Sequence, residues 1–581
     1  MSQKKLKKLR RLETILVPKI EEIKIQPWAA IKKIIKENWK FLVILSIGII
    51  ALYINGMRGD FVSDGYATIP QNPQINDFWV MVKNSASFTN YIVYKLFGFA
   101  SPVAHHVFSL LAYLVFCWLA FIVLEVVFDS KKLSRLTMLI FAVHPIHVEA
   151  ISWVSGRIYL LLAIYIMVGF LGFVFYVRNN QAKYLLITLG AFILAFTTDK
   201  PRPFSLFLLM FVYLLFIGIK KVKINWKRLI AGVFVLGIVF TIFAWPYINF
   251  RIGAVNSGYN SSDSIFYNPF FQYPTGIAKY LQLLLFPIDL TLYHTMYILP
   301  AWLNWLVLLT YLGLIVYFYF KDKRYFFALS FILAAIIPSI MPVKVSWLVA
   351  ERYMFLGSLG FCLFLALIFD SLMKKYKVIS ISIFSLLICI YGVRAFLRNI
   401  DWKTNHLLWV STCQVSPNSH NAWNNIGDDY DKLAQLETTE NGRMAQYLNA
   451  IKGFTRSTIV KSNYADAFHN RANIFYKINR FDLARDSYET ALYFGPNLYQ
   501  SYFSLLQIDL NEKRYDLAMD HLNKLHKVKP NDMQVYYVTA VVYANMGRAD
   551  QAIPILEEIL KAAPNFQEAK TLLASIKSQK K

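Results

Sequence analysis

Acidic, basic and imidazole side chains recur in four separate connections between strongly apolar segments of the chain. These connections carry Asp60 and Asp64, then His144, His147, Glu149 and Arg157, then Asp199, Lys200 and Arg202, and finally Glu351 and Arg352. Ionisable residues beside membrane spans are costly and often functional. A carboxylate can remove a proton from a hydroxyl, and Arg or Lys can hold a phosphate. The pattern therefore predicts one polar site, able to hold an anionic lipid phosphate beside a catalytic base.

Simpler roles are open to the same residues. They are a helix cap for Asp64, an internal salt bridge for Glu351 with Arg352, and headgroup contacts for Arg157, Lys200 and Arg202. His144 and His147 are three residues apart, which places both imidazoles together on a helix with Glu149 close by. However, H-x-x-H-x-E is not an established zinc spacing. We therefore expect hydrogen-bonding support from these histidines and predict no metal.

Composition indicates what must position these residues. Of 581 residues, 56% are hydrophobic, 16% aromatic and only 17% charged. This excludes a disordered chain, a collagen, a coiled coil and a disulfide-rich scaffold, and it indicates an integral membrane protein. The net charge of +26 lies in the first 411 residues (+24), because residues 412–581 carry only +2. A basic excess confined to an apolar region indicates cytoplasmic loops and anionic lipid contact, not nucleic-acid binding.

Eleven apolar segments are predicted to cross the membrane as helices, since a span needs roughly 20 residues. They lie at residues 40–56, 106–128, 136–150, 158–177, 184–198, 204–219, 229–249, 302–320, 325–342, 353–372 and 378–394. If these spans alternate, the Lys/Arg clusters share the cytoplasmic side and the polar connections lie outside. Residues 276–299 are interpreted as an interfacial or re-entrant segment on the outer face. The predicted domains are a basic cytoplasmic arm (1–39), a transmembrane domain (40–400) and an extracytoplasmic repeat domain (401–581).

The last part of the chain repeats. Pro-Asn or Ser-Asn pairs begin at residues 417, 462, 496, 530 and 564, so the last three intervals are 34 residues and the first is 45. A 34-residue period is the tetratricopeptide signature. We expect about four helix pairs and a capping helix (566–581), with the inserted residues 431–441 lengthening the turn of the first pair. The predicted fold class is therefore all-α: a polytopic membrane helix bundle followed by an α-solenoid.

A solenoid usually presents a concave surface to a peptide or protein. The polar side chains predicted to face this groove are those of Asn424, Asp428, His469 and Asn473. The alternative for each is a solvated helix face.

Several motifs together resemble a known family. They are FVSDG (61–65), HPIHVEAISWVSGR (144–157), YLQLLLFPIDLTLY (280–293), AERYMFLGSLG (350–360) and RNIDWKTN (398–405). In this order and combined with the repeats, they resemble the transmembrane and tetratricopeptide-repeat-containing O-mannosyltransferase-like proteins, which are C-superfamily glycosyltransferases with bacterial relatives. The resemblance implies a sugar transferred from a polyprenyl-phosphate donor to a Ser or Thr of a translocated protein.

The sequence departs from that family at two points. Gly65 replaces the second acid of the family's usual acidic pair, so Asp64 stands alone. Lys200-Pro201-Arg202 replaces the family's usual Ser-Lys-Glu. The first departure weakens any role that needs two carboxylates, a bound metal above all.

As a hypothesis, Asp64 is the general base, with Glu149 as an alternative or assisting group. The candidate phosphate-binding residues are Arg157, Lys200, Arg202 and Arg352, and the supporting residues are His144, His147 and Glu351. No cofactor is predicted, because a lipid monophosphate leaving group does not demand a metal; the lipid-linked sugar is itself the donor substrate. The expected partners are the membrane and an exported acceptor protein held by the repeats.

Three other functions are open. The first is an oligosaccharyltransferase or an enzyme that builds surface glycans or lipid glycans. The second is a membrane-anchored repeat scaffold without catalysis, although a pure anchor needs only one span. The third is a transporter. The charged residues argue against it, because they are expected at one face of the membrane and not at the bilayer midplane, where transporter sites usually lie. The expected location is a bacterial inner membrane with periplasmic repeats, or the endoplasmic reticulum membrane with lumenal repeats in a eukaryote.

Overall fold

The computed structural model describes residues 26–98, 101–219, 224–232, 268–297, 299–340 and 347–579, with isolated positions between 233 and 249. Within these residues every regular element is a helix. The chain divides into two compact units, Met1–Ser416 and Pro417–Lys581. The expected all-α class is confirmed. The predicted arm lies largely outside the described residues, and its last part, from Pro27, belongs to the first helix.

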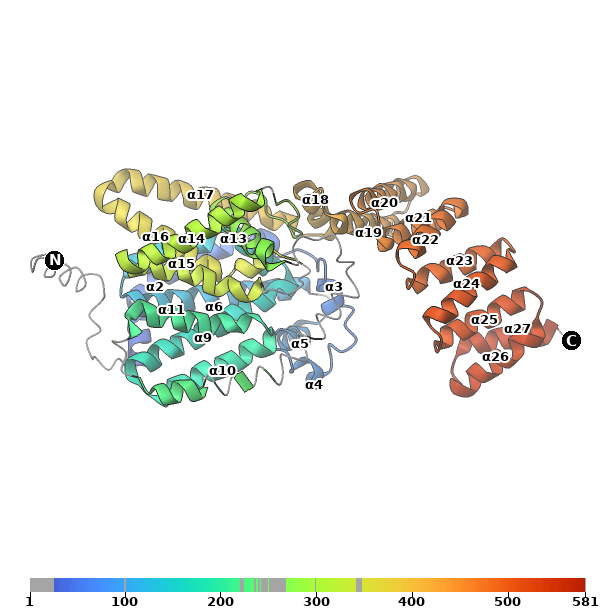
Figure 1. Cartoon of the computed structure of the whole chain (residues 1–581), viewed down its shortest axis with the longest axis horizontal. Coiled ribbons are helices and arrows are strands. Elements are labelled where there is room, and N and C mark those ends of the chain that lie inside the picture. The colour runs from blue at the N-terminus through green and yellow to red at the C-terminus, as the bar shows by residue number, and fades with distance from the viewer. Residues whose placement is uncertain are drawn as a thin grey trace, which may run out of the picture. The chain divides into compact units, whose positions relative to one another are not determined.

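Six helices of the first unit are long and apolar enough to cross a membrane. They are α2 (Pro27–Tyr53), α6 (Pro102–Phe128), α9 (Arg157–Asn179), α14 (Ala301–Lys321), α16 (Gly357–Lys375) and α17 (Lys377–Asp401). Shorter helices run beside them in Figure 1: α10 (Ala182–Thr198), α11 (Ser205–Ile217), α13 (Pro269–Leu285) and α15 (Lys323–Ile336). A further short helix, α7 (Lys131–Val143), packs on α16 and α6. The expected count of about eleven spans is therefore not confirmed. The predicted span at 229–249 lies mostly outside the described residues.

Prolines explain two of the shortened helices. The segment 136–150 was expected to be one helix, but α7 ends at Val143 and His144, just before Pro145, is extended (φ −67°, ψ 123°). A residue before proline is disfavoured in the α region, so the helix stops there. Helix α15 gives way to a 3₁₀ turn at Ile337–Ser339, which contains Pro338. Here the reason is that proline has no N–H with which to continue the helical hydrogen bonds.

The polar connections lie at one end of the bundle. They contain α3 (Gly65–Thr68), α4 (Phe78–Met81), α5 (Ser85–Phe97), α8 (Val148–Ser152) and the 3₁₀ turns η1 (Ile54–Gly56), η2 (Pro145–His147), η3 (Val154–Gly156), η4 (Arg202–Phe204) and η8 (Glu351–Met354). Figure 1 shows α3, α4 and α5 gathered at this end. At the opposite helix ends, Lys131 pairs with Glu37 (2.6 Å) and Lys132 with Asp370 (2.9 Å). The site residues and these two lysines are thus separated along the bundle.

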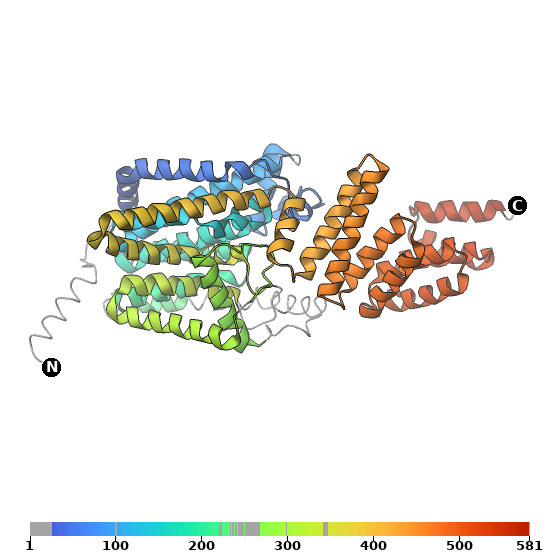
Figure 2. The same ribbon diagram turned by 90° about the horizontal axis from the view of Figure 1, so that it is seen from above.

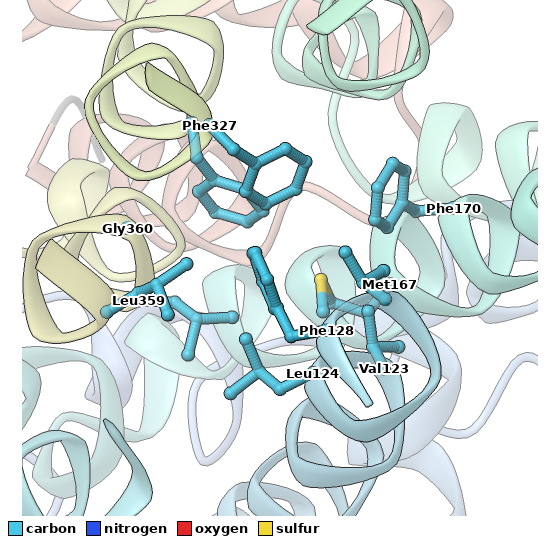
Figure 3. A pocket seen from close by; sticks show the side chains of 11 residues that line it. Val123, Leu124, Phe128, Met167, Phe170, Phe327, Leu359 and Gly360 are labelled. Carbon is cyan, nitrogen blue, oxygen red and sulfur yellow. The ribbon is translucent and has the colours of Figure 1, made fainter. Parts of the chain in front are cut away.

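The interior between these ends is tightly packed. Figure 3 shows side chains of α6, α9, α15 and α16 pointing toward one another around a residual cavity of about 10 Å³. Its lining is entirely apolar, with Met167, Phe170 and Phe327 among the residues. A methyl group added at Gly360 would lie 2.6 Å from the backbone oxygen of Ala328, so α15 and α16 touch through backbone here. This cavity is core packing and offers no group for chemistry.

The second unit consists of four helix pairs and a last helix (Figure 2). The pairs are α19 (His420–Leu436) with α20 (Glu440–Val460), α21 (Ala465–Lys477) with α22 (Phe481–Phe494), α23 (Tyr499–Asn511) with α24 (Tyr515–Val528), and α25 (Met533–Asn545) with α26 (Ala549–Ala562); α27 (Gln567–Gln579) follows. One expectation was wrong. The inserted residues do not lengthen the first turn, which is three residues as in the next pair, but lengthen both helices of the first pair.

The boundary between the units lies after α18 (Asn405–Val415) and not at residue 400. The predicted boundary falls at the end of α17, and α18 still packs on the first unit. The ring of Trp409 stacks at 5.9 Å on that of Tyr293. Asn405, the first residue of α18, accepts a hydrogen bond from the Ser63 amide.

Candidate active site

The centre of the polar end is an ion pair between Glu149 on α8 and Arg352 on η8. One carboxylate oxygen of Glu149 contacts the Arg352 guanidinium, and the other accepts the Arg352 backbone N–H at 2.8 Å. Glu149 is fully buried and Arg352 is 7% exposed. Burial opposes the charge on Arg352, but the Glu149 carboxylate beside it raises the pKa of the guanidinium well above its ordinary value. Nε of Arg352 has no hydrogen-bond partner among the described residues.

The neighbouring residue, Glu351, is neutralised from a different direction. Its carboxylate lies 3.3 Å from the guanidinium of Arg398 on α17 and 3.7 Å from Nε2 of His294. Arg398 also pairs with Asp401 at 2.9 Å. The salt bridge of Glu351 with Arg352 that the sequence allows is therefore not formed, because each of the two residues has its own partner.

Arg202 joins Arg352 at a small cavity. Arg202 pairs with Asp199 (2.5 Å) and donates from Nε to the Ser339 hydroxyl (3.0 Å). The guanidinium carbon of Arg202 lies 4.1 Å from the ring centre of Tyr353. The guanidinium carbon of Arg352 lies 4.9 Å from the centre of the same ring. Tyr159 lies beside both arginines, and the cavity that these four residues help to line measures about 20 Å³. Two cations held by aromatic faces can bind an anion.

Asp64 lies on an exposed loop at the same end of the bundle. Its side chain makes no hydrogen bond or ion pair with any residue that the structure describes, Glu149 included. The loop is fixed by its backbone: the Ser63 amide donates to Oδ1 of Asn405 and the Asp60 amide to the oxygen of Lys403, both at 2.8 Å. Asp64 is thus positioned and accessible.

Trp153 connects this loop to the arginine cluster. Its Nε1 donates to the oxygen of Val62 at 3.2 Å, and the Arg352 guanidinium lies 5.2 Å from its ring. The structure therefore brings Asp64's loop, Glu149, Arg202 and Arg352 to one region, from connections far apart in the sequence.

Arg157 and Lys200 have other partners. Arg157 is 1% exposed and donates to the Ser109 hydroxyl (3.1 Å), the Asn90 side chain (3.0 Å) and the oxygen of His105 (2.7 Å). Lys200 donates to the Phe196 oxygen (3.2 Å), and burial lowers its pKa. Both were expected to bind phosphate, but the structure places neither at the Arg202–Arg352 cavity.

His144 and His147 are fully buried and hydrogen-bonded within the protein. Nε2 of His144 bonds the oxygen of Leu284 (3.1 Å) and its Nδ1 accepts the Ile146 amide (3.2 Å). His147 bonds the hydroxyls of Tyr113 (3.1 Å) and Ser358 (2.7 Å). His147 thus uses both nitrogens to hold η2 against other elements, whereas His144 uses one to cap the start of η2 and the other to bond Leu284. Among the described residues no group of three or more His, Cys, Asp and Glu could hold a metal ion.

Three of the four predicted groove residues make hydrogen bonds along the first helices of the pairs. Oδ1 of Asn424 accepts from Asn470 (3.1 Å), and His469 bonds Ser501 (2.8 Å) and Asn473 (3.2 Å). These bonds run between α19, α21 and α23 and make a polar ladder along the first helices of the pairs. Asp428 instead pairs with Lys432 within α19 (2.6 Å).

Sequence reasoning missed five residues of this region. They are Trp153, Tyr159, Tyr353, Arg398 and Asn405. Four of them lie within quoted motifs, and Tyr159 follows one of these motifs by two residues. Their aromatic or amide side chains carry no charge signal, apart from Arg398, and the tyrosines and tryptophan do not stand out in a chain that is 16% aromatic.

Comparison with known proteins finds similarity in both units of the chain. Models described as tetratricopeptide repeat match residues 465–497 and 510–576. The human protein named Protein O-mannosyl-transferase TMTC3 is 26% identical over 522 residues, covering 78% of this chain and 55% of the human protein. Protein O-mannosyl-transferase F38B6.6 of Caenorhabditis elegans is 25% identical, covering 71% of this chain and 62% of the worm protein. The chain spans a little over half the length of these relatives.

Two solved structures resemble parts of the chain only weakly. The crystal structure of MamA is 16% identical, covers 27% of this chain and 85% of its own, and has a TM-score of 0.24. YrrB, described as a TPR protein with an unusual peptide-binding site, is 16% identical. The match covers 35% of this chain and 96% of YrrB, with a TM-score of 0.24. These scores are too low to support any inference about this chain. The sequence relatives are the stronger result: over about three quarters of its length, the chain is homologous to proteins named as protein O-mannosyl-transferases.

Proposed function

We propose that this chain is a membrane-embedded glycosyltransferase that moves a mannose-like sugar from a polyprenyl-phosphate donor to Ser or Thr hydroxyls of exported proteins. The observation that supports this best is the placement of an accessible, unpartnered carboxylate, Asp64, at the bundle end that also holds the Arg202–Arg352 cavity. The homology to proteins named as protein O-mannosyl-transferases favours the same activity. The six long apolar helices indicate a membrane protein.

In the proposed reaction, Asp64 takes the proton of the acceptor hydroxyl as its oxygen attacks C1 of the sugar. The bond between C1 and the phosphate oxygen breaks, and the polyprenyl phosphate leaves with the bonding electron pair. Arg202 and Arg352 stabilise the negative charge that develops on this phosphate. Single displacement by one base inverts the anomeric centre. Glu149 assists by holding Arg352, because its carboxylate is already committed to that guanidinium.

The side of the membrane follows from charge. Lys131 and Lys132 lie at the end away from the candidate site, and Lys/Arg-rich ends usually face the cytoplasm. The candidate site then faces the periplasm, or the lumen in a eukaryote. The repeats hold the acceptor through the polar ladder of Asn424, His469 and Asn473.

Replacing Asp64 by Asn tests the proposal. We expect Asp64→Asn to lower transfer from a polyprenyl-phosphate mannose to a Ser/Thr-rich peptide by about 10²–10⁴-fold, the usual contribution of a general base. Asp60→Asn is the matched control, since Asp60 is exposed on the same loop, and it should retain activity. Full activity of Asp64→Asn in purified membranes would end the proposal. Separation of protein-linked from lipid-linked products distinguishes it from a lipid or surface-glycan transferase.

A further inference from the structure

The residue before Asp64 has an unusual backbone conformation. Ser63 has φ +52°, in the left-handed region that residues other than glycine rarely adopt. Such a conformation persists only where the surroundings enforce it, and such residues cluster at functional sites. Here the enforcing contact is visible, because the Ser63 amide donates to Oδ1 of Asn405 at 2.8 Å. The direction in which the chain presents Asp64 therefore depends on the side chain of a residue about 340 positions later.

Asn405 belongs to a segment that also contacts the arginine cluster. In the motif RNIDWKTN (398–405), Arg398 pairs with Glu351. The side-chain oxygen of Asn399 accepts a hydrogen bond from the Ser152 hydroxyl at 2.8 Å. The ring of Trp402 lies 6.1 Å from that of Trp153, which itself lies against Arg352. The backbone oxygen of Lys403 then accepts the Asp60 amide. One segment thus holds both the Asp64 loop and the residues around Arg352.

We propose that Asn405 is a positioning residue for Asp64: its amide oxygen fixes the left-handed Ser63 and thereby aims the Asp64 carboxylate toward the acceptor hydroxyl. This inference rests on the proposed function of Asp64 and adds to it the residue that makes the loop competent. Asn405 touches neither substrate in this scheme. Its loss therefore misplaces the base while the Arg202–Arg352 cavity keeps its contacts.

The test compares Asn405→Ala with Asn405→Asp in the full-length protein. Transfer is measured with polyprenyl-phosphate mannose and a Ser/Thr-rich peptide. We expect Asn405→Ala to lower kcat about 10- to 100-fold, the effect of a small misplacement of a catalytic group, with the KM for the donor unchanged within twofold. Asn405→Asp keeps an oxygen acceptor for the Ser63 amide and should retain most of the activity. A merely structural role would not separate these two variants.

Asn55→Ala is the matched control. The Asn55 side chain donates to the oxygen of Phe396 at 2.8 Å and so joins the same two regions of the chain, away from Asp64. It should leave kcat unchanged. If Asn405→Ala does not fold, Asn405→Ser replaces it, because serine suits a helix start but its side chain is shorter. Wild-type kcat in the Ala or Ser variant, with Asp64→Asn inactive, overturns this inference alone, whereas an active Asp64→Asn overturns the proposed function.

Discussion

At the scale of single residues, Glu351 and Arg352 show how the protein manages buried charge. The two are neighbours in the chain, yet Glu351 meets Arg398 and Arg352 meets Glu149. An isolated buried charge is very costly, whereas a paired and hydrogen-bonded one is tolerated. These crossed pairs join α8, η8 and α17, so charge neutralisation also fixes how three distant segments meet.

Breaking one of these pairs should therefore destabilise the protein. We expect Glu149→Ala to cost about 3–5 kcal/mol, because it leaves the Arg352 guanidinium buried without its carboxylate. The measurement is the unfolding free energy or melting temperature of the detergent-solubilised protein. The control is the double variant Glu149→Leu with Arg352→Met, which removes both charges and should regain stability but not sugar transfer. A Glu149→Ala variant as stable as the wild type would contradict this account.

At the same scale, the sequence indicates which residues carry charge but not what their partners are. The acidic and basic residues of four connections do gather at one end of the bundle. Nothing in the sequence distinguishes Arg352, which lines a cavity, from Arg157. The Arg157 guanidinium donates hydrogen bonds to Ser109, Asn90 and His105 instead. Likewise the spacing of His144 and His147 fits a ligand pair, and only the structure reveals that all four ring nitrogens have hydrogen-bond partners within the protein.

At the scale of elements, apolar length locates helices well but overestimates how far they run. The apolar run at 136–150 continues past His144, yet α7 ends before Pro145. A hydropathy pattern does not register the backbone restriction that proline imposes on its predecessor. This is why the helix at 131–143 is too short to count among the six candidate spans.

Close helix contact makes Gly360 a position that should not tolerate a side chain. Gly360→Ala would place a methyl carbon 2.6 Å from the Ala328 oxygen, and we expect a loss of about 1–3 kcal/mol from the resulting shift of α15 against α16. Thermal unfolding of the solubilised protein measures it. Gly48→Ala in α2 is the control, because nothing lies within 4 Å of the added atom. Equal melting temperatures for the two variants would show that α15 and α16 can separate freely.

The insertion in the first repeat follows the helical period. Helices α19 and α20 have 17 and 21 residues, against 13 and 14 for α21 and α22. Four extra residues are about one turn and seven are about two. The added residues therefore keep the packing faces in register. Sequence spacing reveals the insertion but does not reveal that it is divided between two helices.

At the scale of the whole molecule, the division into an apolar bundle and a repeat array could be predicted. The 34-residue period and the fall in net charge after residue 411 both mark it. The boundary itself could not, because α18 has the mixed composition of the repeats. It belongs to the bundle through contacts of Asn405 and Trp409 with residues far away in the sequence.

Stability should also depend on pH through the repeats. Burial lowers the pKa of His469 to about 4, and the ring bonds Ser501 and Asn473. The unfolded chain, with a His pKa near 6.5, binds this proton first, so stability should fall as the pH drops from about 6.5 to about 4. The slope is less than about 1.4 kcal/mol per pH unit, since water partly screens the half-buried ring.

Melting temperatures of the full-length protein between pH 7 and pH 5 measure this dependence. His469→Gln should flatten the slope without abolishing it, because burial also lowers the pKa of His420 to about 4. An unchanged slope in His469→Gln would show that His469 does not contribute.

The bond between Ser63 and Asn405 has a consequence for biosynthesis. The two residues are separated by 342 positions, so a ribosome must add hundreds of amino acids before the loop can close. At about 5–20 residues per second this takes on the order of 20–70 s. During that interval a nascent chain, already inserted through its early helices, has no fixed geometry around Asp64. Under the proposed function, a translation product that ends before Asn405 would therefore be inert.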